Sequence, residues 1–177
     1  MKTKHFITIC LLCCFTSTTI FSCSPKSKTA TNTTDTAQDG TQYVDFGMET
    51  PDGKTIKISD FVSENKYTLV DFWASWCGPC HAEMPTIVLA YDNFHSKGLE
   101  IIGVSLDIKK DDWVRAISEM KMNWPQMSDL KGWDSEGAQL YGVRSIPANV
   151  LINQQGKVVA QDLRGEDLLQ KLAELMK

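Results

Sequence analysis

The sequence predicts an α/β fold in which a central mixed β-sheet is flanked by helices. Two apolar runs, residues 67–73 and 99–105, have the length and composition of strands buried inside a sheet. Between them, residues 78–96 carry apolar side chains at spacings of three and four, the period of a helix with one buried face. A strand, a helix and a second strand in this order predict a right-handed βαβ unit with parallel strands.

Shorter patterns on both sides of this unit complete the prediction. Alternating residues around Pro51-Asp52-Gly53 predict an N-terminal β-hairpin, and Ser59 is the expected cap of a short helical turn. Turn residues at 153–156 separate two strand patterns and predict a second hairpin. The other predicted elements are helices at 109–122, 135–141 and 166–176 and a short strand at 123–127.

The composition indicates one domain with appendages and argues against a nucleic-acid partner. The chain has 177 residues and a formal net charge of −4, and its sequence contains no basic stripe or block of Lys and Arg. Four of its six cysteines lie within the first 23 residues, and only Cys77 and Cys80 lie in the region that looks globular. Two neighbouring cysteines cannot staple a fold, so the chain is not a disulfide scaffold.

Residues 1–22 have the pattern of an export signal. A short basic start precedes an apolar core that is too short and too polar for a membrane span. The segment ends in Ile20-Phe21-Ser22-Cys23, which resembles the lipobox of bacterial lipoproteins, although Phe is unusual at its middle position. We therefore expect a lipoprotein-type signal peptide, lipidation at Cys23 and a location on the periplasmic side of a bacterial membrane. The alternative is an ordinary signal peptide cut nearby, with Cys23 left as a free thiol.

A polar segment separates this leader from the globular part. Residues 23–42 are rich in Ser and Thr, poor in apolar residues and without periodicity, which is typical of a flexible tether. About 20 such residues span roughly 25 Å on average. Residues 43–177 form the predicted globular domain and are numerous enough to bury one core.

Cys77 and Cys80 lie at the junction between the first buried strand and the helix that follows it. A Cys-x-x-Cys pair in this setting indicates thiol redox chemistry. At a helix N-terminus the first thiol meets unpaired N–H groups and the positive end of the helix dipole, which favour the thiolate and lower the pKa from the free value of ~8.5. Cys80, one turn deeper, is placed to attack a mixed disulfide formed at Cys77.

Zinc and haem are the other groups that such a cysteine pair can hold. A structural zinc site needs four ligands, and residues 43–177 offer only His81 and His95 besides the two cysteines. Cys77 to His81 also matches the C-x-x-C-H pattern of haem attachment, but the βαβ setting favours redox chemistry. We therefore expect neither a metal ion nor another cofactor.

Three further residues are candidates for the chemistry of the pair. Asp71 lies within an apolar strand, where burial would raise its pKa and suit it to accept a proton from Cys80; an edge position facing water is the simpler interpretation. Glu83 follows Cys80 by one helical turn and is either a second proton carrier or an ordinary exposed glutamate. Pro147 precedes a predicted strand, where a trans bond is common and a cis bond would be a specific feature.

Two segments of the chain resemble a known fold family. Val70 to Cys80 is similar to the active-site segment of thioredoxin, and Tyr141 to Pro147 resembles the segment that carries that family's cis-proline. The longer motif Trp76-Cys77-x-Pro79-Cys80-x-x-Glu83-x-Pro85 resembles the membrane-tethered TlpA/ResA-like thiol-disulfide oxidoreductases, a branch of the superfamily that contains AhpC/TSA, redoxin and thioredoxin proteins. The N-terminal hairpin and an extra helix and strand between 109 and 127 are also similar to that branch.

The resemblance implies a thioredoxin fold and a role for each residue of the site. Cys77 would be the nucleophile and Cys80 the resolving thiol, and together they would form a redox-active disulfide. Trp76 would flank the site, Pro147 would be cis, and the backbone of Ile146 would pair with the substrate.

Two carboxylates are implied as proton carriers. Glu83 would match the active-site glutamate of the tethered branch. Asp71 stands where many tethered members have Asn, and it matches thioredoxin instead. The sequence leaves open which of the two handles the proton.

The function that this resemblance implies is the reduction of protein disulfides outside the cytoplasm. A disulfide-containing protein would be the substrate, a membrane thiol reductase would supply the electrons, and cytochrome c maturation is one expected setting. An oxidant or isomerase with the same residues, a peroxidase, and a non-catalytic haem-binding or chaperone-like module are the alternatives.

Overall fold

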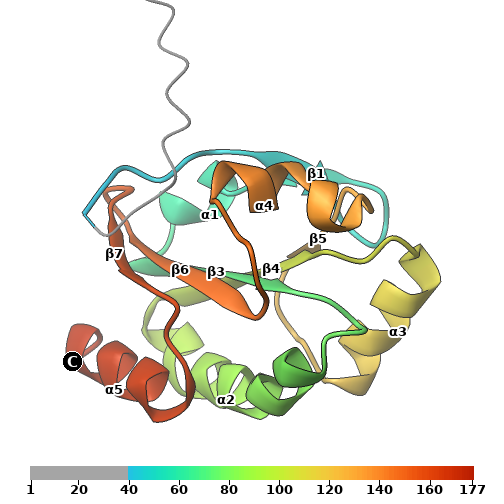
Figure 1. Ribbon diagram of the computed structural model, residues 1–177. Coiled ribbons are helices and arrows are strands. Elements are labelled where there is room, and N and C mark those ends of the chain that lie inside the picture. Colours follow the sequence, from blue (N-terminus) through green and yellow to red (C-terminus); the bar gives the residue numbers. More distant parts are fainter. Residues whose placement is uncertain (1–39) are drawn as a thin grey trace, which may run out of the picture. The chain divides into compact units, whose positions relative to one another are not determined.

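A five-stranded mixed sheet forms the centre of the domain (Figure 1). The computed structural model describes residues 40–177. The strand order is β5-β4-β3-β6-β7. β3 pairs in parallel with β4 and β4 with β5, whereas β6 is antiparallel to both β3 and β7. The strands are β3 (Tyr67–Trp73), β4 (Leu99–Ser105), β5 (Gln126–Met127), β6 (Ala148–Asn153) and β7 (Val158–Gln161).

Helices cover both faces of this sheet. In Figure 1, α2 and α5 lie together against one face, and α1 and α4 lie against the other beside the N-terminal hairpin. The helix α3 belongs to the connection between β4 and β5. The α-helices are α1 (Ser59–Val62), α2 (Gly78–Phe94), α3 (Lys110–Glu119), α4 (Glu136–Leu140) and α5 (Gly165–Leu175); two 3₁₀ turns, η1 (His95–Lys97) and η2 (Gly132–Asp134), accompany them.

The N-terminal hairpin packs onto the domain through buried side chains. Its strands β1 (Gly47–Glu49) and β2 (Thr55–Lys57) are antiparallel, and Phe46 and Met48 are buried beside them. The ring of Phe46 lies so close to α4 that a Cβ on Gly137 would approach its Cε2 to 2.5 Å. A residue without a side chain at 137 therefore allows the hairpin to seal this face of the core.

The long elements lie where the sequence predicted them, and the short ones differ. The two apolar runs form β3 and β4 with the predicted bounds, and they pair in parallel as expected. The predicted cap of α1 is wrong: Ile58 occupies the N-cap position, no side chain caps the helix, and the N–H of Ser59 donates to Asp45 Oδ1 at 2.9 Å. The predicted strand at 123–127 shrinks to the two residues of β5, because Pro125 has no N–H to donate to a ladder.

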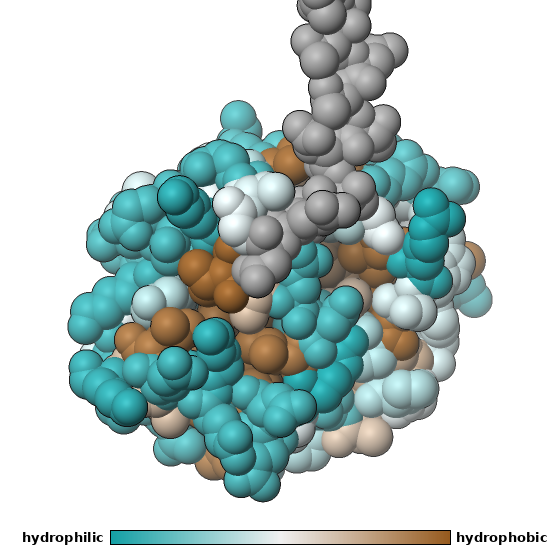
Figure 2. All heavy atoms as spheres, turned by 60° about the vertical axis from the view of Figure 1, so that its left-hand side comes forward, coloured by the Kyte–Doolittle hydropathy of each residue, from teal (hydrophilic) through white to brown (hydrophobic). Residues whose placement is uncertain are grey.

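The described part of the chain begins along β7. Gly40 N–H donates to Val158 O at 2.7 Å, Val158 N–H to Thr41 O at 2.9 Å, and Tyr43 N–H to Gly156 O at 2.8 Å. The predicted signal peptide (1–22), the lipidation site Cys23 and the tether residues before position 40 lie outside the described residues. Within 40–177 we find no helix with the length and hydropathy needed to span a bilayer. On the face drawn in Figure 2, hydrophilic side chains predominate and hydrophobic ones show through in small patches.

Candidate active site

The two cysteines lie at the start of α2, just after the loop that follows β3, and they form a disulfide. Cys77 is the N-cap residue of α2, and its Sγ accepts a hydrogen bond from the N–H of Cys80 at 3.1 Å. Both cysteines are buried, whereas the preceding Trp76 is 54% exposed. Once the disulfide is reduced, this N–H and the helix dipole stabilise a thiolate at Cys77, which is the form that attacks another disulfide.

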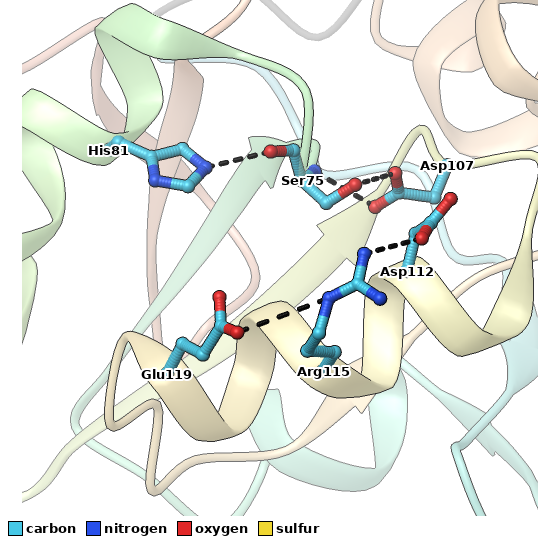
Figure 3. A network of polar contacts seen from close by, with 6 residues as sticks. All are labelled: Ser75, His81, Asp107, Asp112, Arg115 and Glu119. Carbon is cyan, nitrogen blue, oxygen red and sulfur yellow. Dashed lines mark hydrogen bonds and ion pairs between the residues drawn. The ribbon is translucent and has the colours of Figure 1, made fainter.

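The loop before Cys77 is held by a buried carboxylate, Asp107 (Figure 3). Asp107 follows the end of β4, and its two oxygens accept three hydrogen bonds. Ser75 donates its N–H at 3.0 Å and its hydroxyl at 2.6 Å, and the hydroxyl of Ser105 donates at 2.7 Å. Asp107 therefore fixes the backbone two residues before the reactive cysteine.

His81 holds the same loop from the opposite side, as Figure 3 shows. Its Nε2 lies 2.7 Å from Ser75 O, and because a carbonyl only accepts, Nε2 carries the proton. In this structure the disulfide joins both sulfurs of the C-x-x-C-H pattern, and the ring nitrogen of His81 serves the loop. This geometry favours redox chemistry over haem attachment. Among residues 40–177, no group of three or more His, Cys, Asp or Glu side chains is placed to hold a metal ion.

Asp71 is buried in the middle of the sheet, not at an edge facing water. Its neighbours across the two ladders are Gly103 and Asn149, and no described residue donates a hydrogen bond to its carboxylate. Burial is the main cause that raises the pKa of Asp71; the positive charge of Arg164 lowers it, the negative charge of Glu83 raises it, and the net result is a pKa of about 7. The carboxyl group can therefore gain or lose a proton near neutral pH.

Glu83 has a different environment. It is partly buried on α2, and its Oε1 accepts a hydrogen bond at 2.8 Å from the N–H of Gly165, the first residue of α5. Glu83 thus links the active-site helix to the N-terminus of α5.

The peptide bond between Ile146 and Pro147 is cis, as the resemblance implied. Pro147 is partly buried, and its carbonyl accepts a hydrogen bond from the guanidinium of Arg164. No residue in the described part of the chain forms a hydrogen bond with the backbone N–H or C=O of Ile146. These two groups are available to pair with another chain.

A second exposed tryptophan lies beside Trp76. The ring of Trp133, in η2, is 6.2 Å from that of Trp76 and is 48% exposed. Ile108, 67% exposed, lies against the same turn, because a Cβ on Gly132 would approach its Cγ2 to 3.0 Å. We call Trp76, Ile108 and Trp133 the apolar surface of the site.

The prediction from sequence missed Asp107 and Arg164. It also missed Ile108 and Trp133 of the apolar surface. Asp107 carried a usable signal, because it follows a strand parallel to β3 and the carboxyl ends of parallel neighbours meet at one edge of a sheet. Arg164 and Trp133 carried none. Each lies in a short connection whose position depends on contacts far away in the sequence.

Comparison with known proteins gives a consistent result. The profile of the AhpC/TSA family matches residues 40–161. The thiol-disulfide oxidoreductase ResA of Bacillus thuringiensis subsp. konkukian is 31% identical over 143 residues, which cover 77% of this chain and 79% of that protein. ResA of Bacillus subtilis is 32% identical over 121 residues, 68% of this chain and 65% of that protein.

Solved structures agree with this match. The crystal structure of the thioredoxin domain of a thiol-disulfide oxidoreductase from Bacteroides vulgatus superimposes with a TM-score of 0.73 at 32% identity, covering 79% of this chain and 99% of that chain. A thiol-disulfide oxidoreductase from Bacteroides fragilis gives a TM-score of 0.71 at 32% identity, covering 76% and 99%. The predicted thioredoxin fold is confirmed.

Proposed function

The chain belongs to the AhpC/TSA family and is a thioredoxin-fold thiol-disulfide oxidoreductase related to ResA, and from this premise we propose that it reduces disulfide bonds in proteins. The observation that carries the proposal is the Cys77–Cys80 pair at the N-terminus of α2, where the N–H of Cys80 donates to the sulfur of Cys77. That arrangement favours a nucleophilic thiolate at the first cysteine.

The proposed cycle has two thiol-disulfide exchanges. The Cys77 thiolate attacks one sulfur of the substrate disulfide; a mixed disulfide forms, and the other substrate sulfur leaves as a thiolate. Cys80 then loses its proton and attacks the Cys77 sulfur, which forms the Cys77–Cys80 disulfide and releases the second substrate thiolate. Two electrons have passed to the substrate, and a dithiol reductase returns the site to its reduced form.

Asp71 is the proposed proton acceptor for Cys80. Its pKa of about 7 lets it hold and release a proton at neutral pH, which a general base requires. Glu83 accepts the N–H of Gly165, so its proposed role is to anchor α5 and to add negative charge beside Asp71.

A polypeptide substrate fits the surroundings of the cysteine pair. The free backbone groups of Ile146 can pair with an extended chain, and Trp76, Ile108 and Trp133 offer apolar contact beside the cysteine. Val143, Ser145 and Ala148, which flank Pro147 in the sequence, are among the residues that line a hollow. Apoproteins of c-type cytochromes are the substrates that we propose from the TlpA/ResA-like resemblance, with a membrane thiol reductase as donor and a lipid anchor at Cys23.

The redox potential of the pair tests the direction of electron flow. The Gly-Pro dipeptide between the cysteines resembles thioredoxin, so we expect a potential of about −270 mV. The potential can be read from tryptophan fluorescence in a series of thiol and disulfide buffers. A potential of about −120 mV would instead identify a disulfide-forming oxidant.

Cysteine variants test the mechanism. C77S is expected to lose insulin-disulfide reduction, and C80S to accumulate a mixed disulfide with the substrate. Full activity of C77S would exclude the proposed cycle. Peroxide consumption by the wild type that exceeds its disulfide reduction would favour the peroxidase alternative.

A further inference from the structure

Arg164 occupies the junction between β7 and α5 and reaches into the site. It is the N-cap residue of α5, and its side chain is 34% exposed. Its guanidinium donates one hydrogen bond to Pro147 O and another to Leu163 O at 3.1 Å. A single side chain thereby holds the carbonyl of the residue that follows the cis bond.

The backbone on each side of Arg164 is fixed by separate contacts. The side chain of Asn149 brackets Leu163, accepting from its N–H at 3.0 Å and donating to its carbonyl at 2.8 Å. On the other side, the N–H of Gly165 donates to Glu83 at 2.8 Å. Because both neighbours are held, the guanidinium approaches the site from a preorganised backbone.

The same guanidinium supplies the positive charge that acts on Asp71. The described charges that bear on this buried carboxylate are Arg164, which favours its ionised form, and Glu83 on α2, which disfavours it. The cross-strand neighbours Gly103 and Asn149 are uncharged. Asp162, 70% exposed and 3.6 Å from the guanidinium, partly compensates the positive charge.

We propose that Arg164 is a positioning residue that couples the cis-proline loop to the proton acceptor Asp71. By holding Pro147 O, it keeps the loop in place and leaves the backbone of Ile146 free for substrate. By placing a positive charge near Asp71, it stabilises the carboxylate that receives the proton of Cys80. The redox part of this inference rests on the proposed function, whereas the electrostatic part rests on the fold alone.

Three variants separate the two effects. R164M removes the charge and the donors, and R164K keeps the charge but loses the planar fork of donors. D162N removes the competing negative charge, and Asn tolerates the positive φ of 51° at this position. The matched control is R115M, because Arg115 also forms ion pairs with acidic residues but lies on α3.

The first measurement is the titration of the Asp71 carboxyl by ¹³C NMR in the oxidised protein, which does not depend on turnover. R164M is expected to move the midpoint upward by about one pH unit, the lower end of the effect of a nearby opposite charge, because the side chain is partly exposed. The Asp71 midpoint of R164K should stay near that of the wild type. In D162N the midpoint should move downward, and in R115M it should not change.

The second measurement is the pH profile for release of the second substrate thiol in single turnovers, together with KM for a disulfide peptide. In R164M the pH profile should shift to higher pH by the same amount as the Asp71 midpoint. Both R164M and R164K should raise KM for the peptide but not for a small aromatic disulfide. An Asp71 midpoint that R164M and D162N leave unchanged would overturn the electrostatic part. An unchanged KM in folded R164K would overturn the loop part.

Outcomes for the proposed function are distinct from these. If the wild type reduces no protein disulfide, the proposed function fails, while the NMR titration still decides whether Arg164 acts on Asp71. If R164M does not fold, R164K and D162N alone decide the inference. A raised peptide KM in R164K with an unchanged Asp71 midpoint, together with a lowered Asp71 midpoint in D162N, supports it. Wild-type values for both variants in both measurements overturn it.

Discussion

Three carboxylates belong to the segments that hold the redox pair or pack beside them, and each has its own environment. Asp107 accepts three hydrogen bonds and holds the loop that leads to Cys77. Glu83 accepts one amide N–H and anchors α5. Asp71 is buried without such donors, so its pKa rises to about 7. The same functional group, a carboxylate, therefore anchors a loop at Asp107, links two helices at Glu83 and can carry a proton at Asp71. The three sites differ in how many hydrogen-bond donors face the carboxylate.

Asp107 offers a test at this scale. In D107N an amide N–H₂ replaces one oxygen and faces the donors that Asp107 now accepts, so we expect the free energy of unfolding to fall by about 1–3 kcal/mol. Attack of the reduced protein on a small disulfide should slow as well, because the loop before Cys77 loses its anchor. Urea unfolding and stopped-flow kinetics measure the two effects.

S75A is the matched control, since it removes only the hydroxyl donor and keeps the backbone N–H bond to Asp107. We expect it to lose about 1 kcal/mol. A D107N protein as stable and as fast as S75A would contradict the anchoring role.

At the scale of elements, those fixed by their own sequence could be predicted, and those fixed by contacts with distant parts of the chain could not. β3 and β4 could be read from sequence because long apolar runs are buried on both faces, and the cysteine pair because its chemistry is local to the start of α2. The turn η2 was not predicted, because its position depends on packing beside Ile108. The contact of Arg164 with Pro147 joins two loops that only the folded sheet brings together.

The apolar surface gives a prediction for one of these elements. W133A should raise KM for a protein or peptide disulfide roughly fivefold or more, because tryptophans at interfaces carry a large share of binding energy. The rate with a small aromatic disulfide should not change, because Cys77 and its loop are untouched. L89A removes another exposed apolar side chain, on α2, and should affect neither substrate. Equal losses on both substrates in W133A would argue against a docking role for Trp133.

On the scale of the whole molecule, a buried acid in the central strand links redox chemistry to stability. The folded protein holds the proton of Asp71 up to about pH 7, whereas an unfolded chain releases it near the ordinary value of 3.8. Between these values the folded state binds more protons, so the free energy of unfolding falls as the pH rises. Below this window both states are protonated and the contribution is fully present.

D71N should remove this dependence. Relative to D71N, the wild type is expected to lose about 4 kcal/mol of stability between pH 4 and pH 8, the product of the pKa difference and 1.36 kcal/mol per unit. Urea unfolding of both oxidised proteins across this range measures the difference. Parallel stability curves for the two proteins would show that Asp71 does not titrate in the folded state as described.

The pairing of residues 40–43 with β7 has a mechanical consequence. A pulling force that enters the domain through Gly40 acts first on the hydrogen bonds to Val158 and Gly156 at the edge of the sheet. The cysteines, by contrast, are held by β3, α2 and the end of β4, at the centre of the sheet. The hydrogen bonds at this edge can therefore break under tension while those that hold the redox pair stay intact.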